Sequence, residues 1–408
     1  MADTLRPRDA KDVAQAVEWA AGEGKTLEIV GVGSKRRICR AAQWDLTLDL
    51  SGLTGVTLYE PEELVLSARA GTPITEIDAL IGSKGQELAF EPIDCGPLFG
   101  AGANKGTLGG VLAANIAGPR RIKSGAARDH FLGVSAVSGR GETFKSGGRV
   151  VKNVTGYDLC KVLAGSWGTL AAMTDVTVKV LPRAETEQTL IAFGLDDRTA
   201  VKAMAAALGS PADVSAAAHM PAGVAPQVAG AAAAGRSVTA LRLEGVGPSV
   251  AARRAGLEAL LKPDGELIAI SERASHALWQ AVRDVTPFEP PASGPVLPLW
   301  RISTAPSRGP EIVTQVAAQC EAAALYDWGG GLVWLEIAGR ADAGARFVRR
   351  ATAACGGHAT LYRADAAVRA SVDVFEPQAP ALAALTRRVK EGFDPKGILG
   401  PGRMYAGT

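Results

Sequence analysis

The sequence contains little of what metal centres and disulfide frameworks require. Only five cysteines and four histidines occur among its 408 residues. The cysteines are odd in number and scattered, without the close spacing that iron–sulfur clusters and structural zinc sites need. No two histidines lie within one or two helical turns of each other, so no histidine-rich metal site is predicted. We expect the cysteines to be buried thiols; they are Cys39, Cys95, Cys160, Cys320 and Cys355.

Charge and long apolar runs are also scarce. Charged residues make up 21% of the chain and the formal net charge is +2, so there is no broad basic field of the kind that attracts nucleic acid. No run of about eighteen apolar residues predicts a transmembrane helix. The first residues carry charges of both signs, and no apolar core of a signal peptide follows them. We therefore expect a cytoplasmic protein with no membrane span and no nucleic-acid partner.

The first glycine-rich segment follows a predicted helix and strand. Apolar residues recur at helical spacing over residues 10–21, and residues 27–30 form a short predicted strand. Residues 31–35 (Gly-Val-Gly-Ser-Lys) come next. Glycines let a backbone approach a ligand closely, and consecutive N–H groups with serine and lysine side chains can bind phosphate oxygens. A Rossmann turn does not fit, because its third glycine would fall on Arg36, and no Walker A motif occurs. A purely structural turn is the alternative.

The second glycine-rich segment covers residues 100–110 and leads into small residues up to 118. Each glycine costs roughly 0.5–1 kcal/mol relative to alanine in regular structure, so this density needs a reason. Close approach to a bulky anionic ligand is one such reason. A flexible loop would explain the glycines, but not the apolar residues 111–114 that follow directly.

Four further segments carry polar side chains, but their residue types do not specify one reaction. Residues 120–123 (Arg-Arg-Ile-Lys) precede Arg-Asp-His at 128–130, and a solvated basic turn is the alternative interpretation there. Residues 151–159 (Val-Lys-Asn-Val-Thr-Gly-Tyr-Asp-Leu) are followed by 165–170 (Gly-Ser-Trp-Gly-Thr-Leu).

The second half of the chain alternates predicted strands and helices. Predicted strands cover residues 188–194, 213–220, 237–244, 266–270, 296–304, 332–338 and 358–363. Predicted helices cover residues 197–208, 248–261, 273–285, 309–322 and 343–354. The order begins as strand, helix, strand, strand, helix, strand, which is a ferredoxin-like unit, and the later elements partly repeat it. This order predicts an α+β fold with helices on one face of an antiparallel sheet.

Two stretches of the second half show no such alternation. The alanine-rich residues 221–236 predict a flexible insertion. The tail from 391 to 408 contains Phe-Asp-Pro and Gly-Pro-Gly-Arg, which predict turns rather than regular structure.

Four of these segments together resemble the FAD-binding domain of the vanillyl-alcohol oxidase or PCMH type. That family carries a strand with a glycine loop and serine near its N-terminus, then Thr-x-Gly-Gly, then Arg-Asp before a strand, and then Gly-Thr-Leu where another strand begins. The corresponding residues here are 31–35, 107–110, 128–129 and 168–170. The order and spacing of all four make the resemblance specific.

Within that family, the chain resembles the FAD-binding subunit of bacterial glycolate oxidase, the GlcE type, over nearly its whole length. The matching segments include residues 49–53, 59–61, 71–73, 85–92, 118–121, 152–158, 299–303 and 393–395. The resemblance implies a PCMH-type FAD-binding domain at residues 1–185 and a ferredoxin-like α+β cap domain with an antiparallel sheet at 186–365. Residues 366–408 would return towards the flavin domain.

The resemblance also implies which residues hold the cofactor. Many relatives attach FAD through a histidine in the first loop, where this chain has glycine and serine, so non-covalent FAD is implied. The residues that the resemblance places at the cofactor are Gly31, Val32, Gly33, Ser34, Lys35, Thr107, Gly109, Gly110, Asn115, Gly168 and Met173.

The activity implied is oxidation of glycolate, a small 2-hydroxy acid, to glyoxylate. The implied partners are a larger FAD-binding glycolate oxidase subunit and an iron–sulfur subunit that takes the electrons. Relatives that oxidise D-2-hydroxy acids carry His-x-Gly-Asp-Gly-Asn-x-His in the substrate domain, and this sequence does not.

Oxidation of a 2-hydroxy acid needs a cation for the carboxylate and a base for the hydroxyl proton. Arg301 could supply the cation and His358 the base; a stacked arginine and a structural histidine are the alternatives. Three hypotheses stay open: a catalytic complex subunit, a stand-alone FAD-dependent 2-hydroxy-acid or alcohol oxidase, and an FAD-stabilised scaffold subunit without turnover.

Overall fold

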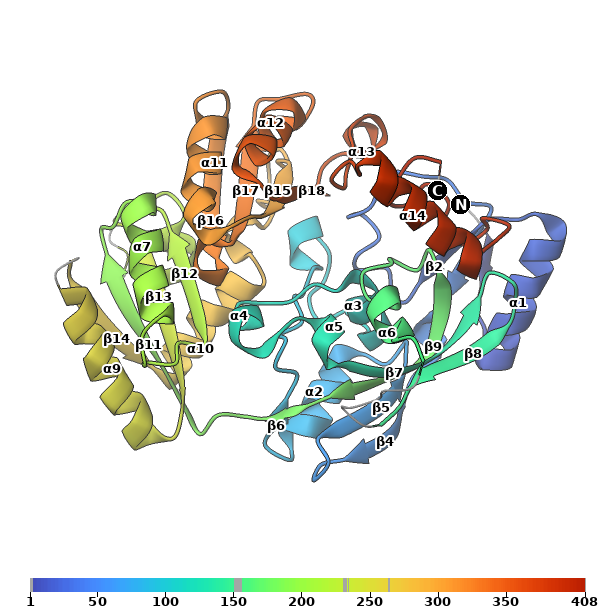
Figure 1. Ribbon diagram of the computed structural model, residues 1–408, viewed down its shortest axis with the longest axis horizontal. Helices are drawn as coiled ribbons and strands as arrows, with labels where there is room; N and C mark the ends of the chain where they lie inside the picture. Colours follow the sequence, from blue (N-terminus) through green and yellow to red (C-terminus); the bar gives the residue numbers. More distant parts are fainter. Residues whose placement is uncertain (1–2, 150–155, 230–232, 234, 263–264, 408) are drawn as a thin grey trace.

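The computed structural model of the chain describes residues 3–149, 156–229, 233, 235–262 and 265–407. Two lobes lie side by side (Figure 1). We call the part from β1 to β10 the N-terminal lobe and the part from β11 to β18 the sheet lobe. The chain then returns to the N-terminal lobe through α14 (Pro380–Phe393) and a short tail (Figure 1). The domain limits at 185 and 365 stay a prediction.

The N-terminal lobe begins with a small parallel sheet under one helix. Its strands are β1 (Asp3–Leu5), β3 (Leu46–Asp49) and β2 (Leu27–Val30), in that order. The Asp9 side chain caps α1 (Ala10–Glu23) by accepting a hydrogen bond from the Asp12 amide, and Gly24 ends the helix in the left-handed conformation. Val13 and Val17, one turn apart, are fully buried. The predicted helix and the strand at 27–30 are confirmed.

A five-stranded antiparallel sheet forms the rest of this lobe. Its order is β4 (Val56–Glu60), β5 (Val65–Arg69), β9 (Ala171–Lys179), β7 (Phe131–Ser138) and β8 (Thr143–Gly147). The helices of this part are α2 (Ile74–Gly82), α3 (Leu108–Ala114), α4 (Arg121–Ser124), α5 (Ala127–His130) and α6 (Leu159–Leu163). A two-stranded ribbon of β6 (Gln86–Glu87) and β10 (Leu181–Pro182) leads towards the sheet lobe.

The sheet lobe is one eight-stranded antiparallel sheet made of two similar units. Each unit runs strand, helix, strand, strand, helix, strand, so the predicted ferredoxin-like order and its repetition are confirmed. The first unit contains β11 (Thr186–Phe193), α7 (Asp197–Leu208), β12 (Ala216–Met220), β13 (Val238–Gly245), α9 (Gly247–Leu261) and β14 (Leu267–Ser271). The second contains β15 (Leu299–Ser303), α11 (Gly309–Ala317), β16 (Glu321–Asp327), β17 (Leu332–Ala338), α12 (Ala345–Cys355) and β18 (His358–Arg363). The strand order is β14-β11-β13-β12-β16-β17-β15-β18.

The two units join where β12 meets β16. His219 pairs with Tyr326 across this seam, and Asp197 of α7 contacts both side chains. The Tyr326 hydroxyl donates to the Asp197 carboxylate at 2.6 Å, and a ring nitrogen of His219 lies 3.3 Å from the same carboxylate. The seam is therefore closed by a side-chain cluster as well as by backbone pairing.

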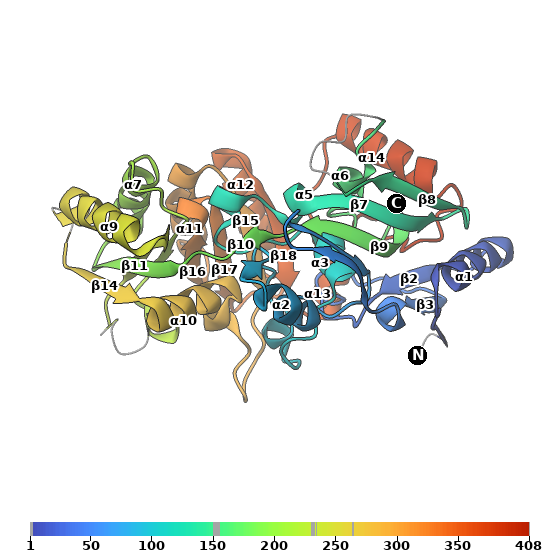
Figure 2. The same cartoon turned by 90° about the horizontal axis from the view of Figure 1, so that it is seen from below.

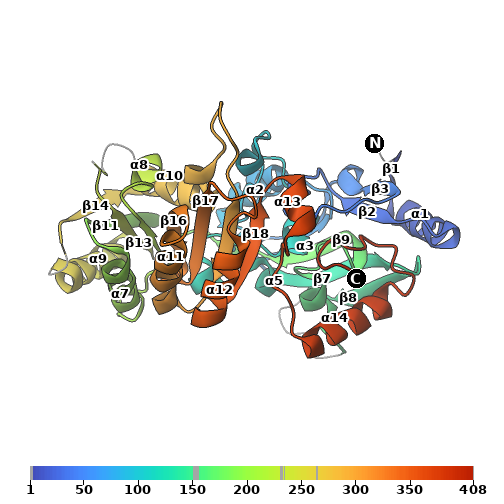
Figure 3. The same ribbon diagram turned by 90° about the horizontal axis from the view of Figure 1, so that it is seen from above.

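Helices cover the two faces of the large sheet unequally. Figure 3 shows α7, α9, α11 and α12 along one face, with α8 (Ala225–Ala229) and α10 (Glu272–Arg283) on the other. Near β15 and β18 that second face meets the N-terminal lobe: the Tyr362 hydroxyl lies 3.1 Å from the Cys95 sulfur, and Phe99 stacks on the Tyr362 ring. The turned view in Figure 2 shows the same side-by-side lobes.

One prediction about the second half is wrong. The helix predicted over 309–322 ends at Ala317, and residues 321–327 form β16. The alanine-rich stretch predicted as a flexible insertion contains the short helix α8, and residues 230–232 and 234 lie outside the described part; its flexibility stays a prediction. All five cysteines are buried free thiols, as predicted. Among the described helices, none combines the length and apolar character needed to cross a membrane.

Candidate cofactor and substrate site

The first glycine segment begins where β2 ends. Gly33 has a φ of +76°, a left-handed conformation that glycine adopts without steric cost. Gly31 packs on Thr107, and a β-carbon added to Gly31 would lie 2.6 Å from the Thr107 hydroxyl oxygen. Lys35 is only 8% exposed, and its Nζ lies 3.5 Å from the Ser34 hydroxyl. This loop therefore combines glycine backbone, which carries no side chains, with the buried cation of Lys35.

The second glycine segment continues into α3. The Thr107 hydroxyl caps this helix by accepting a hydrogen bond from the Gly110 amide at 3.3 Å. A β-carbon on Gly109 would lie 2.7 Å from the Ala70 β-carbon. Glycine is therefore required here so that the start of α3 can pack against the end of β5. The last residues of this segment therefore form the first turn of a helix, which a flexible loop would not.

Both segments line one cleft between the two sheets of the N-terminal lobe. The cleft is partly open to solvent. All predicted cofactor residues except Asn115 line it. The further lining residues are Ile29, Val30, Arg36, Leu50, Ala70, Ala113, Trp167, Ala171 and Arg403.

The lining of this cleft fits an anionic, partly apolar cofactor such as FAD. Glycine backbone and the buried cation of Lys35 lie along one wall, where phosphate oxygens could be bound. Apolar side chains of β9, including Met173, lie along another. Gly168, with a φ of +77°, begins the turn that leads into β9.

Asn115 is placed at the other end of α3. It adopts the left-handed conformation that ends the helix, with a φ of 49°, and its side-chain oxygen accepts a hydrogen bond from the Arg128 amide at 2.9 Å. Asp129 in turn accepts one from the Ala126 amide at 2.8 Å. The Arg-Asp segment is thus tied to the helix that follows the second glycine segment. Residues 151–155 of the predicted segment 151–159 lie outside the described residues.

Arg403 is a cleft residue that the sequence analysis missed. It belongs to the C-terminal tail, where Gly-Pro-Gly-Arg predicted only turns, and it is 5% exposed. No sequence periodicity connects this position with β2. Only the folded chain brings it to the cleft.

Arg301 lies on the face of the large sheet that is turned away from α11 and α12. Its neighbour Trp300, on the opposite face, donates a hydrogen bond to the Ala343 carbonyl. The Arg301 guanidinium carbon lies 5.1 Å from the centre of the Trp328 ring, and Arg121 of α4 lies 4.4 Å from the same ring. Burial, with the nearby charge of Arg121, lowers the pKa of Arg301 to about 10. Its Nε has no hydrogen-bond partner among the described residues.

His358 lies on the same face, one strand away. It pairs with Ser303 while Arg301 pairs with Thr360, so the two predicted substrate residues are diagonal neighbours on β18 and β15. Desolvation and the charge of Arg301 lower the pKa of His358, although the residue as a whole stays accessible to solvent. Both effects favour the neutral imidazole, which is the form that can take a proton.

Asp327 and Trp328 complete this cluster and were not predicted. They form the turn between β16 and β17, and Trp328 adopts a left-handed φ of 54°, which is costly for a bulky residue. Asp327 is 2% exposed, and burial raises its pKa to about 7. The sequence Asp-Trp-Gly-Gly-Gly signals a turn but not a perturbed carboxyl group.

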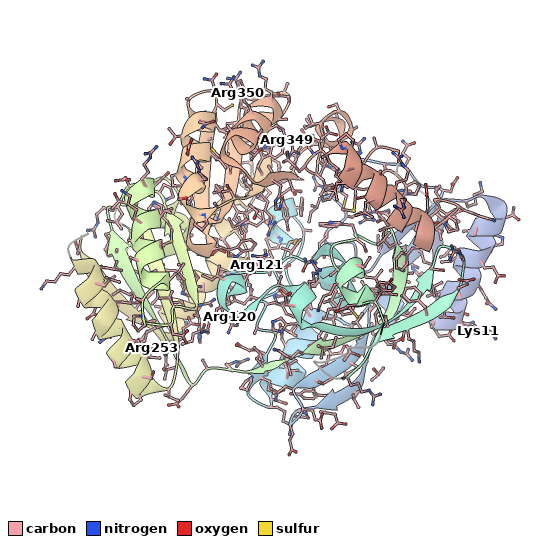
Figure 4. The ribbon with its side chains drawn as sticks, in the orientation of Figure 1. Lys11, Arg120, Arg121, Arg253, Arg349 and Arg350 are labelled. Atoms are coloured by element: carbon pink, nitrogen blue, oxygen red, sulfur yellow. The ribbon has the colours of Figure 1, made fainter. Side chains whose placement is uncertain are left out.

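A charged network holds the two lobes together beside this cluster. Glu91 of the N-terminal lobe accepts hydrogen bonds from both terminal nitrogens of Arg242 in β13, at 2.8 and 3.1 Å. Arg120 lies 3.1 Å from Glu91 and also pairs with Glu87 and Glu244. Burial would raise the pKa of Glu91, but Arg242 and Arg120 outweigh it and lower the pKa to about 2. Figure 4 shows Arg120 and Arg121 between the lobes.

The described residues contain no group of three or more histidine, cysteine, aspartate or glutamate side chains placed to hold a metal ion. The candidate site comprises the cleft of the glycine segments and the arginine cluster between the lobes.

Comparison with known proteins shows which family the glycine segments belong to. A family model described as an FAD binding domain matches residues 2–147. The chain is 33% identical over 394 residues to glycolate oxidase subunit GlcE of Escherichia coli K12, covering 96% of each chain.

Two solved structures share the fold of the whole chain. A 4-ethylphenol oxidase from Gulosibacter chungangensis superposes with a TM-score of 0.73 at 13% identity, covering 99% of this chain and 89% of that one. An alkyldihydroxyacetonephosphate synthase superposes with a TM-score of 0.67 at 15% identity, covering 98% and 75%. At these identities the likeness establishes the fold alone, which is the predicted α+β fold.

Proposed function

The chain belongs to the family of glycolate oxidase subunit GlcE, within the FAD-dependent oxidoreductases, and we propose that it is the FAD-binding subunit of a complex that oxidises glycolate to glyoxylate. The observation that carries this proposal is the single cleft lined by both glycine segments. The arginine cluster between the lobes supports the substrate part of the proposal.

In this proposal, FAD lies non-covalently in the cleft. The loop of Gly31 and Lys35 would hold its diphosphate, the start of α3 at Thr107 would lie along it, and Gly168 and Met173 would contact its adenosine end. The first loop offers no histidine for covalent attachment. Bound FAD would supply the acceptor for the hydride that leaves the substrate carbon.

The substrate carboxylate would be held by Arg301, with Arg121 as a second cation from the other lobe. Both guanidinium groups lie over the Trp328 ring, and a buried arginine with a free Nε is a strong partner for a carboxylate. A neutral ring nitrogen of His358 would take the hydroxyl proton. Loss of that proton and of the hydride converts the alcohol carbon into a carbonyl.

The electrons must then leave the chain. We propose an iron–sulfur subunit as their acceptor and a larger FAD-binding glycolate oxidase subunit as the second partner, by similarity to the GlcE relative. We also propose a cytoplasmic location, since all five cysteines are free thiols.

A scaffold role is the second candidate function. It is favoured by the missing His-x-Gly-Asp-Gly-Asn-x-His segment and by the ion network that fixes the two lobes around Glu91. A scaffold would bind FAD and partners but would not reduce its own flavin with glycolate.

One experiment separates these functions. The chain is co-expressed with candidate iron–sulfur and larger flavin subunits, purified by an affinity tag, and assayed for glycolate-dependent dye reduction with and without this chain. The proposal predicts co-purification, activity that needs this chain, and activity that is strongly lowered in Arg301→Met. Full activity in Arg301→Met would favour the scaffold, and activity of the chain alone would favour a stand-alone oxidase.

A further inference from the structure

The C-terminal tail is built into the wall of the cofactor cleft. Leu399 pairs with Leu27 of β2 in a parallel bridge. The Leu27 amide donates to the Ile398 carbonyl at 2.8 Å, and the Gly400 amide donates to the Leu27 carbonyl at 2.8 Å. The tail therefore extends the small parallel sheet beside the strand that leads into the first glycine segment.

The tail also braces the far end of the first loop. The Arg40 amide donates to the Arg403 carbonyl at 3.1 Å, and the Trp44 indole donates to the Pro401 carbonyl at 3.1 Å. Both ends of the loop that carries residues 31–35 are thus fixed by the same few residues of the tail. The position of this loop depends on the C-terminus being in place.

A buried ion pair anchors the tail to a third part of the cleft. The Lys390 ammonium, at the end of α14, donates to the carbonyls of Thr169 and Leu399, both at 2.7 Å. It also donates to the Asp394 carboxylate at 2.6 Å. Thr169 follows Gly168, which lines the cleft, so the anchor links the tail to the turn before β9.

Arg403 is one of the residues that line this cleft, and its guanidinium group lies 3.5 Å from the Ile29 carbonyl. Its side chain is 6% exposed, and its Nε is buried without a hydrogen-bond partner in the described part of the chain. The nearest carboxylate is Glu28, at 3.6 Å. Glu28 is already engaged by Arg36, whose Nε donates to it at 2.8 Å. One carboxylate thus faces two guanidinium groups, and a buried arginine needs a closer anion.

We propose that Arg403 binds the diphosphate of FAD, and that residues 394–405 form a clasp that retains the cofactor. The proposal rests on the proposed function in one respect, the presence of FAD in this cleft. Lys35, also buried and lining the cleft, supplies a second cation. An arginine fork suits the two acceptors of a phosphate group better than a lysine does. FAD affinity and folding of the last residues are then coupled.

The test measures FAD affinity of the full-length chain after removal of flavin, by quenching of flavin fluorescence on binding. Wild type is compared with Arg403→Met, Arg403→Lys and Arg387→Met. Arg387 lies exposed on α14, so its substitution removes the same charge near the tail without touching the cleft. We expect Arg403→Met to weaken FAD binding about 10- to 100-fold, Arg403→Lys to weaken it less, and Arg387→Met to leave it unchanged.

The double variant Glu28→Gln with Arg403→Met distinguishes cofactor binding from charge balance. If Arg403 only neutralises Glu28, the double variant regains wild-type affinity, and the proposal is overturned. Wild-type affinity in Arg403→Met overturns it as well. The thermal midpoint of the apo-protein is recorded for each variant, to show that it folds. If Arg403→Met does not fold, the FAD affinity of Arg403→Lys is used instead. Wild-type FAD affinity in Arg403→Lys would then overturn the proposal. Failure of wild type itself to bind FAD would instead refute the proposed function.

Discussion

Gly31 and Thr107 lie in direct contact, and a β-carbon on Gly31 would come within 2.6 Å of the Thr107 hydroxyl oxygen. This contact joins the two glycine segments that are far apart in the sequence. Thr107 also caps α3, so a shift at Gly31 would be passed to the start of that helix. The cleft therefore depends on one glycine that has no room for a side chain.

Gly31→Ala should weaken FAD binding. The added methyl group must displace Thr107 or the loop, a strain of about 1–3 kcal/mol, which corresponds to roughly a fivefold to hundredfold loss of affinity if it falls on the bound state. Fluorescence titration with FAD measures it. Gly22→Ala is the matched control, because nothing lies within 4 Å of its β-carbon position; it should keep full affinity. Equal affinities for both variants would show that Gly31 is not at the cofactor.

Glu91→Gln should destabilise the whole protein. Removing one member of a buried ion pair costs about 3–5 kcal/mol, and here two arginines would lose their carboxylate. Urea unfolding at pH 7 measures this loss, and exposed Glu62→Gln is the control. Because the folded pKa of Glu91 is lowered to about 2, its contribution is complete above the unfolded pKa of roughly 4.3 and is lost as the pH falls towards 2. The difference in unfolding free energy between wild type and Glu91→Gln should therefore become smaller as the pH falls over that range. A difference that does not change with pH would contradict the lowered pKa of Glu91.

Asp327→Asn should stabilise the protein more at high pH than at low pH. Burial raises the folded pKa of Asp327 to about 7, so ionising it in the folded state costs free energy as the pH rises from the unfolded value of roughly 3.9 to 7. An asparagine oxygen can still accept the Trp328 amide hydrogen bond. The gain in unfolding free energy should be about 2–3 kcal/mol larger at pH 8 than at pH 5. The same gain at both pH values would argue against a protonated Asp327.

The pH dependence of glycolate oxidation should report His358. Its pKa is lowered by desolvation and by Arg301, so kcat/KM should fall on acidification with a midpoint below roughly 6.5. His358→Gln should lower kcat/KM and remove this limb. Arg301→Met should move the midpoint upwards, besides raising KM, while Arg350→Met, at the far edge of the sheet lobe (Figure 4), should do neither. A midpoint near 7 that survives His358→Gln would point to Asp327 instead.

The sequence alone predicted elements that local chemistry specifies. The helix at 10–21 has its own cap and spacing, and the strands at 332–338 and 358–363 lie where alternation and composition put them. Residues 318–322 were predicted as the end of a helix, because alanine favours helices. Residues 321 and 322 instead begin β16, because the sheet needs a strand between β12 and β17, which is a tertiary requirement.

Only part of the candidate site could be predicted from the sequence. The glycine segments can be recognised in the sequence by their high glycine content. The contact between the lobes cannot, because Glu91 and Arg242 are 151 positions apart. Arg403 reaches Ile29 and Glu28 from the other end of the chain. Such partners are set by topology, so no local pattern could identify them.

The flavin content of the purified full-length chain tests FAD binding most directly. We expect one FAD per chain, released intact into the supernatant when the protein is denatured, because the first loop has no histidine to bond it covalently. A chain that carries no flavin, and whose thermal midpoint does not rise when FAD is added, would contradict the central claim.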